Sequence, residues 1–163
     1  MCEATNVTAR FLMSGSEKKD YIGFHTRTFY PFSNFASFSV RWREREWMTS
    51  EHAYQAAKFL DHYPDIAAEI HQARSAYEAK KIARENKHKV PDSFYNDNRE
   101  IMRDICRAKL NQHEYIQKKL LQTEDKKLVE DSPDDDFWGW GPDKDGKNML
   151  GKIWMELRDD LKE

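Results

Sequence analysis

The chain has 163 residues, of which 39% are hydrophobic and 34% charged, a balance typical of one globular domain with a sizeable core. Its net charge of −2 excludes a global positive field for nucleic acid, although a local groove can still be positive. Cys2 and Cys106 are too few for a disulfide framework or a thiolate metal site, which fits a reducing compartment. Without a signal peptide or an apolar run of membrane length, we expect a cytoplasmic protein that has no membrane partner.

The N-terminal half begins with a polar, aperiodic segment over residues 1–18, which predicts a flexible tail. A first short strand is expected at 21–25. Pro31 then excludes a helix from the aromatic segment 29–35, and Ser33-Asn34 favours a turn whose side chains bond backbone or ligand. Segments 38–41 and 46–48 resemble the two strands of a β-hairpin.

The rest of the chain reads as mostly helical. Ser50 is the expected N-cap of a helix that begins at Glu51, and Ser75 stands over Glu78 in capping-box spacing. Helices are predicted at about 51–61, 64–73, 75–86, 97–111 and 113–122, a strand at 127–130, and a last helix capped by Asn148. Residues 19–163 are thus expected to form a single α+β domain, compact and mostly helical, with a small antiparallel sheet.

The first predicted helix carries an unusual polar face. At roughly 100° per residue, Glu51, Tyr54, Gln55 and Lys58 fall within about a third of the circumference. A solvated face is one interpretation. The alternative is a functional face, because a core helix would place apolar residues there.

An irregular loop is predicted at 134–142, where glycines and a proline surround Trp138 and Trp140. Most of the acidic residues beside it are expected to be solvated. One carboxylate next to an indole in such a loop can hydrogen-bond a base or ribose while the ring stacks on it.

Several common sites have no signal in the sequence. The six histidines show no metal-ligand spacing, and there is no GxGxxG, P-loop or nucleophile elbow. We therefore expect neither a metal nor a cofactor.

Six blocks in order make the chain similar to the YbiA/NADAR family over residues 24–161. They are FSNF at 32–35, Trp47 followed by TSEHAYQAAKF at 49–59, RAKL at 107–110, KLVE at 127–130, DDFWGWG at 135–141 and GKNMLGKIWMELRDDL at 146–161. The resemblance implies a small α+β domain that hydrolyses N-glycosidic bonds. Its substrate would be either ADP-ribosylated guanine in nucleic acid or a ribosylamino-pyrimidine phosphate of riboflavin synthesis.

The resemblance also implies site residues. Glu51, Lys58 and the loop carboxylate Asp135 are the expected catalytic residues, with Asp136 as the alternative to Asp135. Expected contacts with the substrate come from Phe32, Ser33, Asn34, Tyr54, Gln55, Phe94, Trp138, Gly139 and Asn148. Phe94 stands where many relatives have a tryptophan, so a ring for stacking remains but the indole N–H donor is lost.

Two mechanisms remain open for this chemistry. A ribosylated exocyclic amine can ring-open to an imine, which Lys58 can capture as a nucleophile, or water can attack with help from Glu51. The position of Glu51 in the first helical turn favours a base role unless burial overrides it.

Two other classes of protein compete with an enzyme. One is a non-catalytic module that binds ADP-ribose or an NAD derivative. The other is a nucleic-acid-binding protein using Arg41, Arg43, Arg45 and the basic run over 80–89, whose side chains are more simply solvated faces. The sequence leaves the oligomeric state open.

Overall fold

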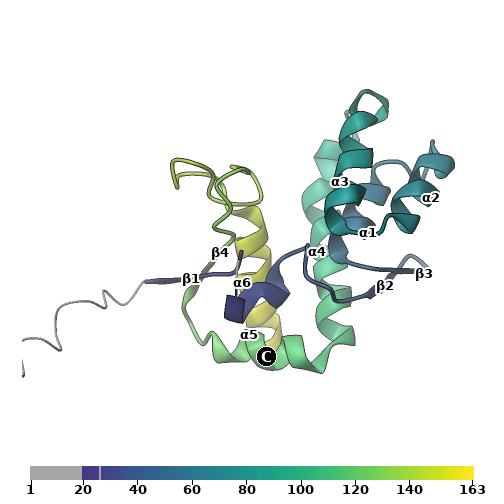
Figure 1. The fold of residues 1–163 in the computed structure, drawn as a ribbon. Helices are drawn as coiled ribbons and strands as arrows, with labels where there is room; N and C mark the ends of the chain where they lie inside the picture. Colours follow the sequence, from purple (N-terminus) through teal and green to yellow (C-terminus); the bar gives the residue numbers. More distant parts are fainter. Residues whose placement is uncertain (1–19, 26) are drawn as a thin grey trace, which may run out of the picture.

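The structure is a computed structural model that describes residues 20–25 and 27–163, so the tail predicted at 1–18 lies outside the described residues. The elements in chain order are β1 (Tyr21–Gly23), the 3₁₀ helix η1 (Arg27–Phe32), β2 (Val40–Trp42), β3 (Arg45–Trp47), α1 (Ser50–Ala57), α2 (Pro64–Gln72), α3 (Ala76–Glu85), the 3₁₀ helix η2 (Lys87–Lys89), α4 (Phe94–Gln112), α5 (Glu114–Gln122), β4 (Lys127–Val129) and α6 (Met149–Lys162). The predicted α+β class is confirmed, and helices dominate it (Figure 1).

Each of the two small sheets has two strands. The predicted hairpin is the antiparallel pair β2–β3, whose register sets Val40 opposite Trp47. Its two-residue turn places Arg43 and Glu44 at φ 50° and 63°, the left-handed conformation that such tight hairpins require. A second sheet pairs β1 with β4 in parallel, with Tyr21 opposite Lys127.

Helix α4 runs between the two groups of elements that make up the rest of the fold (Figure 1). Helices α1, α2 and α3 pack against one another on one side of it, next to the β2–β3 hairpin. On the other side, α6 packs on β4 and on α4, while α5 closes the bottom of the molecule. Among the described residues, no helix is long and apolar enough to span a membrane.

The core joins these groups through large aromatic side chains. Trp47, Trp154, Phe24 and Phe32 are all fully buried. The indole N–H of Trp154 donates a 2.9 Å hydrogen bond to the Phe32 carbonyl oxygen, so α6 is fixed to the end of η1. Burying aromatic rings of this size supplies much of the free energy of folding.

Two local predictions are corrected by the structure. The N-cap of α1 is Thr49, not Ser50, because the Thr49 hydroxyl oxygen accepts the hydrogen bond from the His52 N–H at 3.2 Å. Pro31 lies inside η1, although its presence predicts that segment 29–35 contains no helix. A short 3₁₀ helix tolerates proline because the fixed φ of proline suits the 3₁₀ geometry.

Helix ends differ from the predictions by a few residues. Ser75 caps α3 as predicted and accepts from the Glu78 N–H at 3.0 Å. Helix α4 begins three residues earlier than predicted, at Phe94. Asn148 precedes α6 as predicted, but with φ 50° and no side-chain cap bond.

Candidate active site

The polar face of α1 is buried, not solvated. Thr49 ends the preceding extended segment and caps the helix, so Glu51 lies in the first turn and Lys58 at the C-terminal end. Glu51, Tyr54 and Gln55 are each less than a tenth exposed, and Lys58 is half-buried. Burying these groups together is unfavourable unless they serve one another or a ligand.

Glu51 and Gln55 form the centre of this face. The Gln55 Nε2 atom donates a 2.7 Å hydrogen bond to Glu51 Oε1. Gln55 Oε1 is itself buried and has no hydrogen-bond partner among the described residues. A buried amide oxygen without a partner is costly, and a donor on a bound ligand can satisfy it.

Burial changes the protonation of Glu51. Desolvation raises the pKa of its carboxyl above the usual value of 4.5, and the Asp135 carboxylate raises it further. The Gln55 hydrogen bond and the positive charges of Lys80 and Lys58 oppose this rise. Burial therefore overrides the effect of the helix N-terminus and favours the acid form of Glu51, which can donate a proton.

Lys58 is shifted in the opposite direction. Desolvation lowers the pKa of its amine below the usual value of 10.5, and the positive charges of Lys80 and Lys87 lower it further. Glu51 and Asp135 oppose the shift. The amine nitrogen lies 5.2 Å from the centre of the Tyr54 ring, on the same side of the helix. A neutral amine is thus more available here than on a solvated lysine.

Aromatic rings enclose the face. Tyr54 meets Trp138 edge to face with ring centres 5.3 Å apart, and the ring centre of Phe94 lies 5.8 Å from that of Tyr54. Trp138 is half-buried and Phe94 is buried. The exposed part of Trp138 is therefore available for stacking, whereas Phe94 packs against Tyr54.

The loop over 134–142 is irregular but firmly held. Asp135 Oδ1 accepts hydrogen bonds from the N–H groups of Phe137 and Trp138 at 2.9 and 2.7 Å. A Cβ atom on Gly139 would meet the Glu130 carbonyl oxygen at 2.7 Å, so only glycine allows this close packing. Asp135 thereby orients Trp138, and its charge also acts on Glu51 and Lys58. Asp136 is exposed.

The Ser33-Asn34 turn lies against the start of α1. The Asn34 carbonyl oxygen accepts from the Glu51 N–H at 3.1 Å, and its side-chain oxygen accepts from the Ser50 hydroxyl at 3.1 Å. The Ser33 carbonyl oxygen accepts from the amine of Lys109 at 3.0 Å. Lys109 is fully buried, which lowers its pKa to about 8. The turn thus holds Glu51 in place through its backbone.

Two residues expected in the site have other surroundings. Phe32 lies in the core, where its ring contacts Phe24, Phe29 and Trp154 and has no exposed surface for a ligand. The side chain of Asn148 bridges the Leu128 carbonyl oxygen and the Glu130 N–H, both at 2.9 Å. We therefore assign Phe32 to the core and Asn148 to the anchoring of the loop on β4.

The structure adds residues that the sequence analysis did not place in the site. Asn98 of α4 is buried and hydrogen-bonds to Tyr54, whose pKa is raised by burial. Lys80, Arg84 and Lys87 line a pocket together with Gln55 and Lys58. Their spacing of four and three residues predicts a shared helical face, a signal that was present in the basic run.

No group of three His, Cys, Asp or Glu side chains is placed to hold a metal ion within residues 20–25 and 27–163. What this arrangement offers instead is a buried acid, an amine with a lowered pKa and a ring for stacking. These groups can move a proton, attack an electrophilic carbon and hold a flat heterocycle.

Comparisons with known proteins identify similar chains and a similar solved structure. The chain is 38% identical to the N-glycosidase YbiA of Escherichia coli over 130 residues, which cover 80% of each chain. The solved NMR structure of E. coli YbiA superposes with a TM-score of 0.78 at 35% identity, covering 87% of this chain and 84% of that one. A riboflavin biosynthesis protein of Vibrio vulnificus is 37% identical over 131 residues, which cover 80% of this chain and 35% of that protein.

The predicted enzyme class, a hydrolase of N-glycosyl bonds, matches the name of the E. coli relative. The NADAR domain family itself matches residues 21–162, almost all of the described structure. The chain therefore belongs to the NADAR domain family.

Proposed function

We propose that this protein is an N-glycosidase that hydrolyses the bond between a ribosyl carbon C1′ and the exocyclic amine of a guanine-like heterocycle. The observation that carries the proposal is the pairing of a buried carboxylic acid, Glu51, with a depressed-pKa amine, Lys58, on one face of α1. A module that only binds ADP-ribose needs neither group. The name of the E. coli relative supports the same bond type.

The reaction begins with opening of the sugar ring. Glu51, in its acid form, donates a proton to the ring oxygen as the C1′–O bond breaks. The lone pair of the exocyclic nitrogen forms a C=N bond to C1′ at the same time. The buried, desolvated setting favours the neutral acid that this step needs.

Lys58 then acts on the opened sugar. Its neutral amine adds to C1′, the lysine nitrogen loses a proton to Glu51, and Glu51 returns it to the departing heterocyclic nitrogen. The C1′–N bond to the heterocycle breaks and leaves an imine between C1′ and Lys58. Water adds to this imine, and the C1′–N bond to Lys58 breaks to release the sugar aldehyde and the neutral lysine, while the remaining proton returns to Glu51. The aldehyde then closes to ribose.

The remaining residues position the substrate. Trp138 stacks on the heterocycle beside Tyr54, and Asp135 holds the tryptophan while accepting a hydrogen bond from the sugar or base. Gln55 Oε1 accepts from a sugar hydroxyl, which supplies the partner it lacks. Two substrates share this chemistry: ADP-ribosylated guanine and a ribosylamino-pyrimidine 5′-phosphate. The name of the Vibrio relative favours the second.

Direct incubation tests the proposal. The protein is mixed separately with ADP-ribosylated guanine DNA and with the ribosylamino-pyrimidine phosphate, and the free base or amine is measured by liquid chromatography and mass spectrometry. We expect release from at least one of the two, and the faster one identifies the substrate. Binding of both substrates without release from either would instead indicate the non-catalytic module.

A further inference from the structure

A cluster of positive side chains lies beside the candidate active site and is not used by the proposed chemistry. Lys80 and Arg84 come from α3, and Lys87 begins η2 directly after it. Together with Lys58 they line a pocket of about 170 Å3, whose other walls are Gln55, Ala83, Val90 and Tyr95. The pocket is therefore continuous with the polar face of α1.

The charges in this pocket are only partly offset by the protein, because Glu51 acts on Lys58 and Lys80, and Asp135 on Lys58, without a direct ion pair. No carboxylate lines it, and in the part of the chain that the structure describes, Lys58, Lys80, Arg84 and Lys87 make no ion pair. Like charges brought together repel one another unless an anion lies between them. The neighbouring face of α3 differs, because Lys81 stands one turn from Glu85 and both are exposed.

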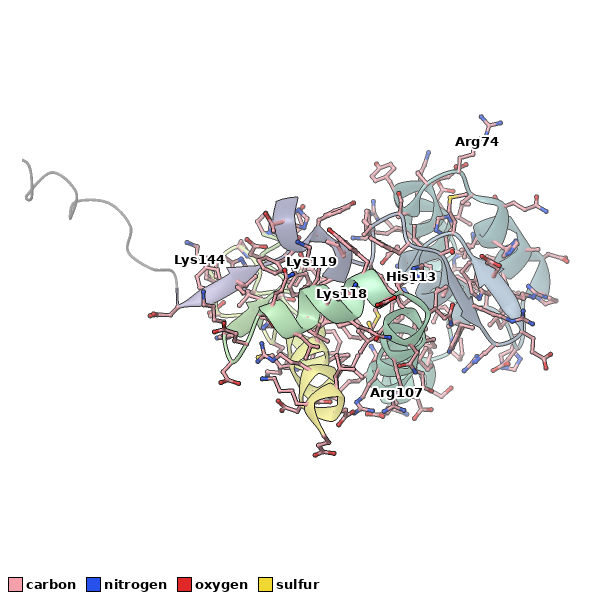
Figure 2. The ribbon with its side chains drawn as sticks, turned by 90° about the horizontal axis from the view of Figure 1, so that it is seen from below. Arg74, Arg107, His113, Lys118, Lys119 and Lys144 are labelled. Carbon is pink, nitrogen blue, oxygen red and sulfur yellow. The ribbon has the colours of Figure 1, made fainter. Side chains whose placement is uncertain are left out.

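Other basic residues do not form a comparable group near the site. Lys118 and Lys119 extend from α5, which lies at the opposite end of the molecule from α3 (Figures 1 and 2). Lys118 is paired with Glu114 at 3.3 Å, and Lys119 lies over the rings of Phe29 and Tyr115. Lys80, Arg84 and Lys87, by contrast, share a pocket with Lys58 of the site.

The pocket has the chemistry of a phosphate site. Arginine offers a planar fork of donors and lysine a compact ammonium, and both bind phosphate oxygens well. Gln55 and Lys58 belong to both the pocket and the catalytic face. A sugar bound beside Lys58 therefore lies next to this pocket.

We propose that Lys80, Arg84 and Lys87 bind the phosphate esterified to the 5′ oxygen of the ribosyl group. The substrate class is then a 5′-phosphorylated glycosylamine, either a monophosphate or the diphosphate of ADP-ribose. This inference rests on the proposed N-glycosidase function and adds to it the part of the substrate that α3 recognises. Because binding of the sugar phosphate can be measured without turnover, the two claims can fail separately.

Calorimetric titration with the sugar that the reaction releases tests the inference. Ribose 5-phosphate, ribose and ADP-ribose are each titrated into the wild-type protein and into Lys80→Gln, Arg84→Gln and Lys87→Gln. We expect ribose 5-phosphate and ADP-ribose to bind more tightly than ribose, and each substitution to weaken both by about threefold to tenfold. Ribose affinity should not change. Lys81→Gln, on the neighbouring face, is the matched control and should keep all three affinities.

Several results would overturn the inference. The first is that ribose binds as tightly as its phosphate, the second that no sugar phosphate binds, and the third that Lys81→Gln costs as much affinity as the pocket variants. If the three substitutions weaken binding of an unmodified oligonucleotide but not of the sugar phosphates, the cluster binds a nucleic acid backbone instead. If the wild-type protein hydrolyses its substrate and the three pocket variants do so at the same kcat/KM, the phosphate site is wrong and the N-glycosidase function stands.

Discussion

The side-chain amide of Gln55 donates a 2.7 Å hydrogen bond to the carboxyl group of Glu51, one turn earlier on α1. This bond lowers the pKa of Glu51 against the larger opposite effect of burial. Gln55 therefore sets how easily the acid is protonated at the pH of the reaction. The Gln55 side chain also lines the basic pocket together with Lys58, so it adjoins both Glu51 and the pocket.

The Gln55→Met substitution removes this hydrogen bond with little change in volume. Without the donor, the pKa of Glu51 should rise further, since the bond stabilises the charged form. If the acid form of Glu51 is the active one, the loss of kcat/KM on raising the pH should move to higher pH in the variant. A pH profile of kcat/KM measures this. If the fall of kcat/KM at high pH stays at the same pH in the variant, or moves to lower pH, the acid role of Glu51 is contradicted.

The imine route depends on Lys58. Borohydride added during turnover should reduce the imine to a stable amine and leave a ribosyl adduct on Lys58, detected by peptide mass. The Lys58→Arg variant should give no adduct and little turnover, because arginine keeps the charge but lacks a nucleophilic amine. Lys81→Arg, on the exposed surface of α3, is the control, and this variant should still form the adduct on Lys58 and turn over substrate. Turnover by Lys58→Arg without any adduct would leave attack by water, assisted by Glu51, as the mechanism.

Trp138 is expected to act in binding rather than in folding. Its ring is half-buried against Tyr54, with a face left for a ligand. The Trp138→Ala substitution should therefore weaken substrate binding by about 1–3 kcal/mol, the usual range for a stacked base. Trp138→Phe should recover part of this loss. If the ring is mainly a core residue, Trp138→Ala will instead lose about 3–5 kcal/mol of stability. Substrate affinity and thermal unfolding, measured together, separate the two roles.

The helical part of the site could be predicted from the sequence because it depends on local spacing. The positions of Glu51, Tyr54, Gln55 and Lys58 on one face follow from the helical period alone. The predicted N-cap, Ser50, lies one residue after the observed Thr49, because both residues are good caps and only the fold decides between them. Whether that face is buried depends on the packing of α3 and α4, which local spacing does not specify.

Contacts between distant segments could not be predicted. The parallel pairing of β1 with β4 joins segments about 106 residues apart, and the strands are too short to specify a partner. Phe32 and Asn148 are predicted ligand contacts, but the sequence does not separate that role from a structural one, because the same side chains serve in cores and in sites. The basic run over 80–89 is predicted to be solvated, because the sequence does not show that part of it shares a pocket with Lys58.

A pH-dependent effect on stability is expected from Glu130, away from the α1 face. Burial raises the pKa of its carboxyl from 4.5 to about 7, while His25, at 3.0 Å, opposes the rise. Because the folded state binds this proton more tightly, the stabilising contribution is full below about 4.5 and is lost as the pH rises through about 7. The free energy of unfolding should thus fall as the pH rises from about 4.5 to about 7.

The Glu130→Gln variant tests this by denaturant titration across the same pH range. The amide does not titrate, so the decrease in the free energy of unfolding should be smaller than in the wild-type protein. The charges nearest to Glu130 are those of His25 and Asp131. An unchanged pH dependence in Glu130→Gln would show that another group is responsible, and His25→Asn then identifies whether it is the histidine.

The role of Glu51 is tested most directly by the amount of free heterocyclic amine released from the ribosylamino-pyrimidine 5′-phosphate by the wild-type protein and by Glu51→Gln. Losing the acid should lower kcat by roughly 10² to 10⁴, the usual effect of a missing acid–base group. Thermal stability should hold or rise at neutral pH, because the raised pKa means that the buried charged form opposes folding. Glu85→Gln, at an exposed position of α3, is the control and should release the amine at the wild-type rate. Near-normal release by a folded Glu51→Gln protein would contradict the account.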